Sequence, residues 1–214
     1  MTAKKTNTGK GTTATTKADT GPKNDDSPNV PAQGATPPIE DSKEDNDGIN
    51  YLPRRNEKGD LLIDGAVVHC SASNLPKHDD IKVIDTWHKA RGWKGVGYHF
   101  FIKRDGTVQS GRPLDDDPYL ESEEIGAHVL GANRRTVGIC LSGIDQNDFT
   151  EAQFNALAET IKKEVLAVNS KAEIYGHNYF TEAKSCPNFP WFEWVKKHFP
   201  KNAPDHGPKA EVKK

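Results

Sequence analysis

The sequence predicts an α/β fold in which one mixed β-sheet is flanked by helices. Three observations lead to this prediction. Short apolar runs alternate along the chain with segments of helical periodicity. Two of these runs are joined by Asp105-Gly106, which favours a hairpin, so the sheet should contain antiparallel as well as parallel neighbours. All of these segments lie within residues 51–200, a length suited to a single domain with one core.

The predicted strands are short, apolar and bounded by turn residues. The first of them, LLIDGAVVHC, is an aliphatic run that ends in small polar residues, which indicates a buried strand. Four segments fit this description: 61–70, the hairpin at 97–111, 136–143 and 172–177.

The clearest predicted helix covers residues 150–168. Thr150 and Gln153 fit a capping box at its start, and Phe149 is placed to pack against Phe154. One face of this helix is apolar and carries Phe154, Leu157, Ala158, Ile161, Val165 and Val168. Two further helices are predicted, at 78–92 and from Pro190 through Phe199.

The two ends of the chain differ in composition from this domain. Residues 1–50 contain no aromatic residue, and the first is Tyr51. Such a segment cannot bury enough apolar surface to offset its ordering entropy, so we expect a disordered extension at 1–50. Residues 201–214, KNAPDHGPKAEVKK, are expected to form a charged, solvated tail.

Charge and hydropathy narrow the range of partners. The chain has 29 basic and 31 acidic residues, and this balance gives no electrostatic case for a nucleic-acid partner. No apolar run approaches the length of a membrane span, and the N-terminus lacks the apolar region of a secretory signal. The cysteines, Cys70, Cys140 and Cys186, are odd in number and widely spaced, which does not resemble a disulfide framework.

Two histidines at the ends of predicted strands, His69 and His177, stand out together with Cys186. Two imidazoles and a thiolate suit Zn²⁺, and three protein ligands leave the fourth tetrahedral position open, as in catalytic sites. The spacing of these three residues in the sequence is by itself weak evidence for a metal site. An alternative makes Cys186 a nucleophile that is activated by His177 without a metal.

Four sequence motifs strengthen the hypothesis that these three residues bind zinc. They are VVHCSAS, WHKARGWKGVGYHFFIKRDGTVQSGR, GAHVLGANRRTVGICLSG and GHNYFTEAKSCPNF, in that order, between about Ala66 and Phe199. Together they closely resemble the zinc-dependent N-acetylmuramoyl-L-alanine amidases, a family that includes phage amidase lysozymes and animal peptidoglycan recognition proteins. Members of that family cleave the amide between the lactyl group of N-acetylmuramic acid and the L-alanine of the stem peptide.

The resemblance implies a role for each matching residue. His69, His177 and Cys186 would hold one Zn²⁺ ion per chain. Tyr98 would be the active-site tyrosine and Lys184 the lysine needed for hydrolysis, and either could stabilise an oxyanion. The resemblance also implies that His128, in GAHVLGAN, is a cleft histidine that contacts the substrate.

One position departs from part of the family. The cytoplasmic cell-wall-recycling branch has a glutamate in the strand that matches GICLSG, where this chain has Cys140. A carboxylate base is therefore absent at that point, which favours the tyrosine-and-lysine arrangement of the phage branch. Cys140 and Cys70 are interpreted as packing residues of the core.

The biology implied by the resemblance is that of a monomeric phage endolysin that binds peptidoglycan. We expect synthesis in the host cytoplasm without a signal peptide, followed by action on the cell wall in the periplasm. Three alternatives stay open: the same chemistry in a secreted antibacterial toxin, a non-catalytic peptidoglycan-binding protein, and binding of RNA polymerase, as in one phage member. Binding modules typically lack the cysteine ligand, so Cys186 argues for catalysis.

Overall fold

A computed structural model describes residues 55–208 of the chain. The extension predicted at 1–50 and residues 209–214 of the predicted tail lie outside the described residues. The elements are, in order, β1 (Leu61–Leu62), β2 (Gly65–Cys70), η1 (Pro76–His78), α1 (Ile81–Ala90), β3 (Phe100–Ile102), β4 (Val108–Ser110), β5 (Tyr119–Leu120), β6 (Thr136–Leu141), η2 (Gln146–Asp148), α2 (Glu151–Ile161), η3 (Lys162–Leu166), β7 (Glu173–Gly176), η4 (His177–Tyr179) and α3 (Trp191–His198).

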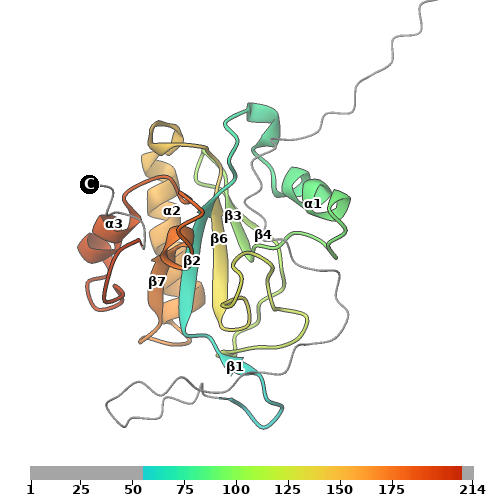
Figure 1. The fold of residues 1–214 in the computed structure, drawn as a ribbon, viewed down its shortest axis with the longest axis vertical. Coiled ribbons are helices and arrows are strands. Elements are labelled where there is room, and N and C mark those ends of the chain that lie inside the picture. The colour runs from blue at the N-terminus through green and yellow to red at the C-terminus, as the bar shows by residue number, and fades with distance from the viewer. Residues whose placement is uncertain (1–54, 209–214) are drawn as a thin grey trace, which may run out of the picture.

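Five strands form the central sheet, in the order β4-β3-β6-β2-β7 (Figure 1). The hairpin pair β3–β4 is antiparallel, and the other three pairs are parallel. The mixed sheet predicted from the sequence is therefore confirmed. The first predicted strand, 61–70, divides in two, because β1 leaves the main sheet and pairs with β5 in a small sheet of its own. The sequence had not indicated β5.

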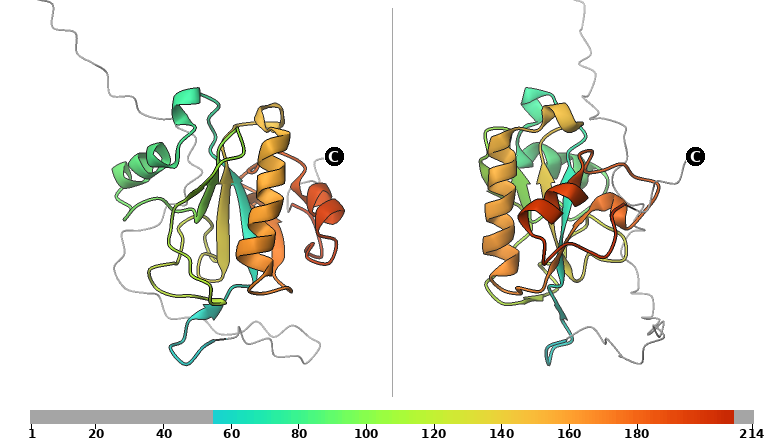
Figure 2. Two further views of the ribbon diagram at one scale, coloured as in Figure 1. Left: turned by 180° about the vertical axis from the view of Figure 1, so that it is seen from behind. Right: turned by 90° about the vertical axis from the view of Figure 1, so that its left-hand side faces the viewer.

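One face of the sheet is covered by α2, with α3 beside it at the β7 edge (Figure 2). Ala66 and Val68 of β2 belong to the same core cluster as Leu157 and Ile161 of α2. Side chains alternate across a strand, so every second residue of β2 contributes to this core. We call this side the α2 face.

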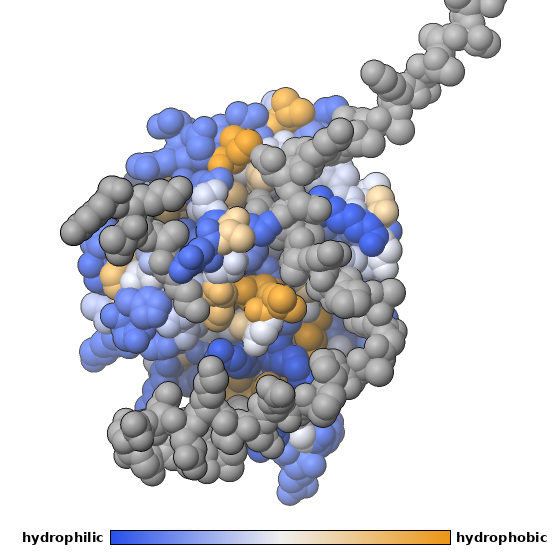
Figure 3. All heavy atoms as spheres, in the orientation of Figure 1, coloured by the Kyte–Doolittle hydropathy of each residue, from blue (hydrophilic) through white to orange (hydrophobic). Residues whose placement is uncertain are grey.

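The opposite side, which we call the site face, is packed differently. Phe101 of β3 and Cys140 of β6 pack under Ile81 and Ile84 of α1, at one end of the face. Nearer β7, Val67 packs with Val129 and Ala132 from the loop before β6 and with Tyr175 of β7. In the space-filling view of this side, apolar residues near the centre are surrounded by hydrophilic ones (Figure 3). The part of the site face over β2 and β7 is thus built mainly from loops.

The ends of α2 follow the local sequence. The Thr150 hydroxyl accepts from the Gln153 N–H and the Gln153 side chain accepts from the Thr150 N–H, so the predicted capping box is confirmed. The rings of Phe149 and Phe154 lie 6.3 Å apart, as the predicted packing requires. The helix ends earlier than predicted: from Lys162 it continues as the wider π-helical turn η3.

The beginning of the predicted C-terminal tail packs on the domain. Asn202 is buried, its side-chain amide donates to the carbonyls of Ser170 and Ala172, and its own carbonyl accepts from Ile174 N–H. These bonds hold the start of the tail beside β7, so residue 202 is part of the fold and not solvated. Within residues 55–208, no helix has the length and apolarity needed to cross a membrane.

Candidate metal centre

His69 and His177 are brought together by the register of two parallel strands. His69 is the fifth residue of β2 and lies on the site face, because Ala66 and Val68 take the α2 face. In the pairing of β2 with β7, Val68 is opposite Gly176, the residue before His177. Parallel strands end at the same edge of a sheet, which is where α/β proteins place their ligands. The two imidazoles therefore meet at the carboxyl end of the sheet.

Cys186 reaches this point from the loop before α3. Its carbonyl accepts a hydrogen bond of 2.9 Å from the Asn178 N–H, directly after His177. Its Sγ accepts one of 3.3 Å from the main-chain N–H of Cys70, directly after His69. Each of the two histidines is thus followed by a backbone amide that holds Cys186, and the loop is fixed between them.

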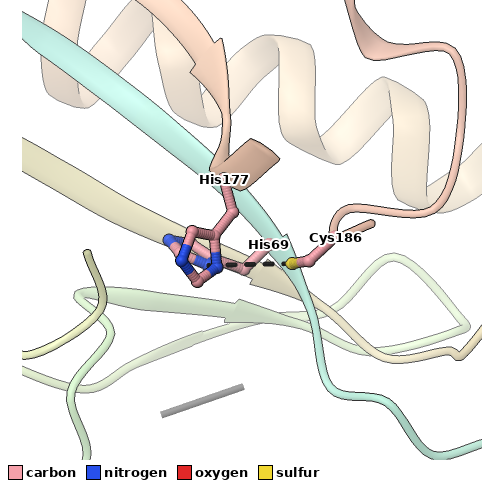
Figure 4. Close-up of side chains that lie close together, drawn as sticks. All are labelled: His69, His177 and Cys186. Atoms are coloured by element: carbon pink, nitrogen blue, oxygen red, sulfur yellow. Dashed lines mark hydrogen bonds between the residues drawn. The ribbon is translucent and has the colours of Figure 1, made fainter. Parts of the chain in front are cut away.

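The three side chains converge on one point (Figure 4). His69 Nδ1 lies 3.2 Å from His177 Nδ1 and 3.8 Å from Cys186 Sγ, and all three ligand atoms lie within 4.8 Å of one another. Bond lengths to a tetrahedral Zn²⁺ ion place neighbouring nitrogen and sulfur ligands about 3.3–3.6 Å apart. The two distances from His69 Nδ1 are close to these values, and the donor set is one that suits zinc.

The protonation state of the histidines also suits a metal. Burial, together with the nearby positive charge of Lys184, lowers the pKa of His177 to about 4. Burial holds the pKa of His69 well below its usual range, and His177 and His128 act in the same direction. Both rings are therefore neutral at pH 7, which is the form in which imidazole binds metals.

Comparison with known proteins agrees with this geometry. The family model described as N-acetylmuramoyl-L-alanine amidase matches residues 59–189, which is more than half of the chain and includes all three candidate ligands. The chain belongs to this amidase family. It is therefore an enzyme of the N-acetylmuramoyl-L-alanine amidase class, as the motifs in the sequence predicted.

This amidase is similar in sequence to endolysins of bacteriophages. It is 40% identical to an endolysin of Enterobacteria phage K11 over 60% of this chain and 83% of the relative. It is 36% identical to the endolysin of Escherichia phage T7 over 63% of this chain and 87% of the relative.

Among solved structures, the N-acetylmuramoyl-L-alanine amidase LysC from Clostridium intestinale is similar, with 29% identity and a TM-score of 0.53 over 70% of this chain and 93% of LysC. Bumblebee PGRP-SA, at 23% identity and a TM-score of 0.52 over 64% and 83% of the two chains, shares the fold.

Two further residues implied by the motifs lie near the three candidate ligands. The Tyr98 ring is buried on the site face, with its centre 5.1 Å from that of His69. Lys184 is half-buried and close enough to His177 for its charge to lower the pKa of that histidine. The structure thus brings both residues into the neighbourhood of the three candidate ligands.

His128, which the motifs imply is a cleft histidine, is buried directly beside His69. Only 2% of its surface is exposed, so its ring does not line an open cleft. Its Nδ1 lies 3.1 Å from His69 Nε2, and its Nε2 lies 3.2 Å from the carbonyl oxygen of Thr136. The ring of His128 thus lies behind that of His69, and its contact with substrate stays a prediction.

The remaining cysteines agree with their interpretation as packing residues. Cys140 is fully buried beneath α1, so the place where the recycling branch has a carboxylate is part of the core here. Cys70 is 1% exposed, points to the side of β2 opposite to that of His69, and is outside the ligand group. The main-chain N–H of Cys70 donates to Cys186 Sγ. The residue types in the sequence do not reveal this contact.

Proposed function

We propose that this amidase hydrolyses the bond between the lactyl carbonyl of N-acetylmuramic acid and the nitrogen of L-alanine, with one Zn²⁺ ion held by His69, His177 and Cys186. The observation that carries the proposal is the convergence of these three ligand atoms within 4.8 Å. In the reaction, water adds across the amide, the C–N bond breaks, the lactyl group gains a carboxylate and alanine leaves as an amine.

The residues of the chain divide the work between them. When bound, Zn²⁺ supplies Lewis acidity, which lowers the pKa of water and polarises a carbonyl. The Lys184 ammonium, near His177, stabilises negative charge that develops on the scissile carbonyl oxygen. The Tyr98 hydroxyl is the second donor proposed for that oxygen, because its ring stands beside His69.

Burial argues against Cys186 as a nucleophile. Reactive cysteines are typically part-exposed, whereas 1% of Cys186 is exposed. Its Sγ also accepts the Cys70 N–H and lies 3.8 Å from His69 Nδ1, which is the environment of a ligand. The same cysteine argues against a binding module without activity.

The biological role that we propose is lysis of a bacterial host by a phage endolysin. Support comes from the relatives, which are endolysins of phages K11 and T7. In that role the enzyme is made in the host cytoplasm and acts, as a monomer, on peptidoglycan of the cell wall.

The test is mass analysis of purified sacculi digested by the wild type and by Cys186→Ala. We expect free lactyl ends and free amino termini of L-alanine from the wild type alone. EDTA should abolish the activity and added Zn²⁺ should restore it. Cuts in glycan chains or in peptide cross-links would refute the bond assignment. Full activity in EDTA would refute the metal.

A further inference from the structure

We propose that His128 is a positioning residue for the ligand His69: its Nδ1 accepts the Nε2–H of His69 and so keeps His69 Nδ1 free of a proton and aimed at the metal. This inference rests on the zinc centre of the proposed function. It assigns to His128 a task within the protein, in place of contact with the substrate.

The contacts of His69 define which nitrogen carries its proton. Its Nδ1 faces His177 Nδ1 at 3.2 Å and Cys186 Sγ at 3.8 Å, and its Nε2 faces His128 Nδ1 at 3.1 Å. A nitrogen that binds a metal cannot keep a proton, so in neutral His69 the proton is on Nε2. That proton points at His128, and the two rings meet edge to face at 86°.

The second imidazole continues the chain of hydrogen bonds. Because His128 Nδ1 accepts from His69, neutral His128 carries its own proton on Nε2. This Nε2 lies 3.2 Å from the Thr136 carbonyl, which has only the acceptor role. The carbonyl at the start of β6 therefore sets the tautomer of His128, and His128 sets that of His69. Outer partners of this kind orient metal ligands in many sites.

The backbone around His128 fits this task. The Asn133 Oδ1 accepts from the N–H groups of His128 and Val129, each at 2.8 Å, which holds the loop at its turn. Gly138 of β6 lies directly against the ring: a Cβ there would come within 2.6 Å of His128 Cγ and Cδ2. A Cβ at Gly126 would come within 2.7 Å of Cδ2. Two glycines thus make room for the ring behind His69.

The decisive comparison is between His128→Asn and His128→Leu. The two side chains have similar shapes, but the Asn Oδ1 can take the place of Nδ1 as an acceptor, whereas Leu leaves the His69 Nε2–H buried without a partner. The readout is Zn²⁺ affinity, measured by competition with a chromophoric chelator on metal-free protein whose fold is checked by circular dichroism. We expect about 10- to 100-fold weaker binding in His128→Leu and a change of about threefold or less in His128→Asn.

The outcomes separate this inference from the proposed function. A wild type that binds no Zn²⁺ would refute the metal centre itself. A wild type that binds Zn²⁺, with His128→Leu binding equally well, would overturn only the role of His128. An equal loss in both variants would also overturn it, since the acceptor would then not be what matters.

A measurement on the unaltered protein covers the case in which His128→Leu fails to fold. In ¹⁵N-labelled, zinc-loaded wild type, the proton should be found on His69 Nε2, with a scalar coupling across the hydrogen bond to His128 Nδ1. If the shared proton were instead bonded to His128 Nδ1, His69 Nε2 would be the acceptor. That result would overturn the inference.

Discussion

The two faces of the central sheet use the same strands for different purposes. On β2, Ala66 and Val68 pack against α2, while His69, one position along, lies on the site face. The α2 face is an apolar core, and the site face over β2 and β7 carries buried histidines and a buried cysteine. In this fold, the alternation of side chains along a strand separates the residues of the core from the candidate ligands, although both are neighbours in the chain.

The separation predicts that losing a ligand abolishes activity without unfolding the protein. Lewis acidity is worth several kcal/mol to the developing charge, so kcat of His69→Ala should fall by about 10³-fold or more. Turnover of soluble muropeptides measures the loss, and denaturant unfolding of the metal-free proteins measures stability. The exposed His198→Ala is the matched control and should behave as the wild type. Retention of wild-type turnover by His69→Ala would contradict the metal assignment.

A core substitution on the α2 face should give the opposite result. Leu157 is fully buried in the cluster that includes Val68. Leu157→Ala should lower the free energy of unfolding by about 2–5 kcal/mol, while the Zn²⁺ affinity of the folded protein stays close to that of the wild type. Urea unfolding and chelator competition measure the two quantities. A large loss of Zn²⁺ affinity in Leu157→Ala would contradict the prediction that the two faces act independently.

Acid should weaken the metal-free protein through its buried histidines, two of which, His88 and His99, lie outside the ligand set. Burial lowers the pKa of both His88 and His99 to about 4. Between that pH and the unfolded value of about 6.5, the unfolded chain binds protons that the folded chain does not, so stability falls as the pH falls from 6.5 toward 4. Each histidine adds a slope of at most about 1.4 kcal/mol per pH unit. Urea unfolding of the metal-free protein across this range measures it.

The variant His99→Asn sharpens the test of acid sensitivity. The Asn Oδ1 can accept the Gly138 N–H in place of His99 Nδ1, while the titrating ring is removed. The pH dependence of unfolding should therefore be shallower than in the wild type. An unchanged profile would show that His99 is not one of the groups responsible.

The smallest effect is expected for Asn178, which connects the site face to the core of the α2 face. The Asn178 Oδ1 accepts from Nε1 of Trp191, which is buried in the core of the α2 face, and its Nδ2 donates to the Ser185 carbonyl beside Cys186. Asn178→Ala leaves the indole N–H unpaired and should cost about 1–3 kcal/mol of unfolding free energy. Asn178→Asp, which keeps the acceptor, should retain more of this stability. Equal losses would assign the effect to the Ser185 contact.

Much of the fold could be predicted because it is encoded locally. The capping box of Thr150 and Gln153 and the Asp105-Gly106 hairpin need only neighbouring residues, and both are present in the structure. The pairing of β1 with β5 and the packing of Asn202 depend on segments far apart in the chain, so no local pattern marks them.

The site shows the same limit. The three candidate ligands could be predicted from the motifs that surround them, because each motif is a pattern of residues that are adjacent in the sequence. The place of His128 could not, because its ring position depends on the Thr136 carbonyl and on the space beside Gly138. A sequence motif can identify a functional residue, but the hydrogen-bond partner of that residue depends on the strand against which the residue packs.

The hydrogen bond from the Cys70 amide to Cys186 Sγ connects two cysteines without using the first thiol. Every residue except proline has such an amide, so position 70 can lose its sulfur and keep the contact. Replacement of Cys70 and Cys140 by alanine would leave Cys186 as the single thiol of a chain that has three cysteines. Because Cys186 is 1% exposed, a thiol reagent would reach this sulfur only when the loop before α3 opens. The rate of labelling of this variant would therefore report opening of that loop through one sulfur atom.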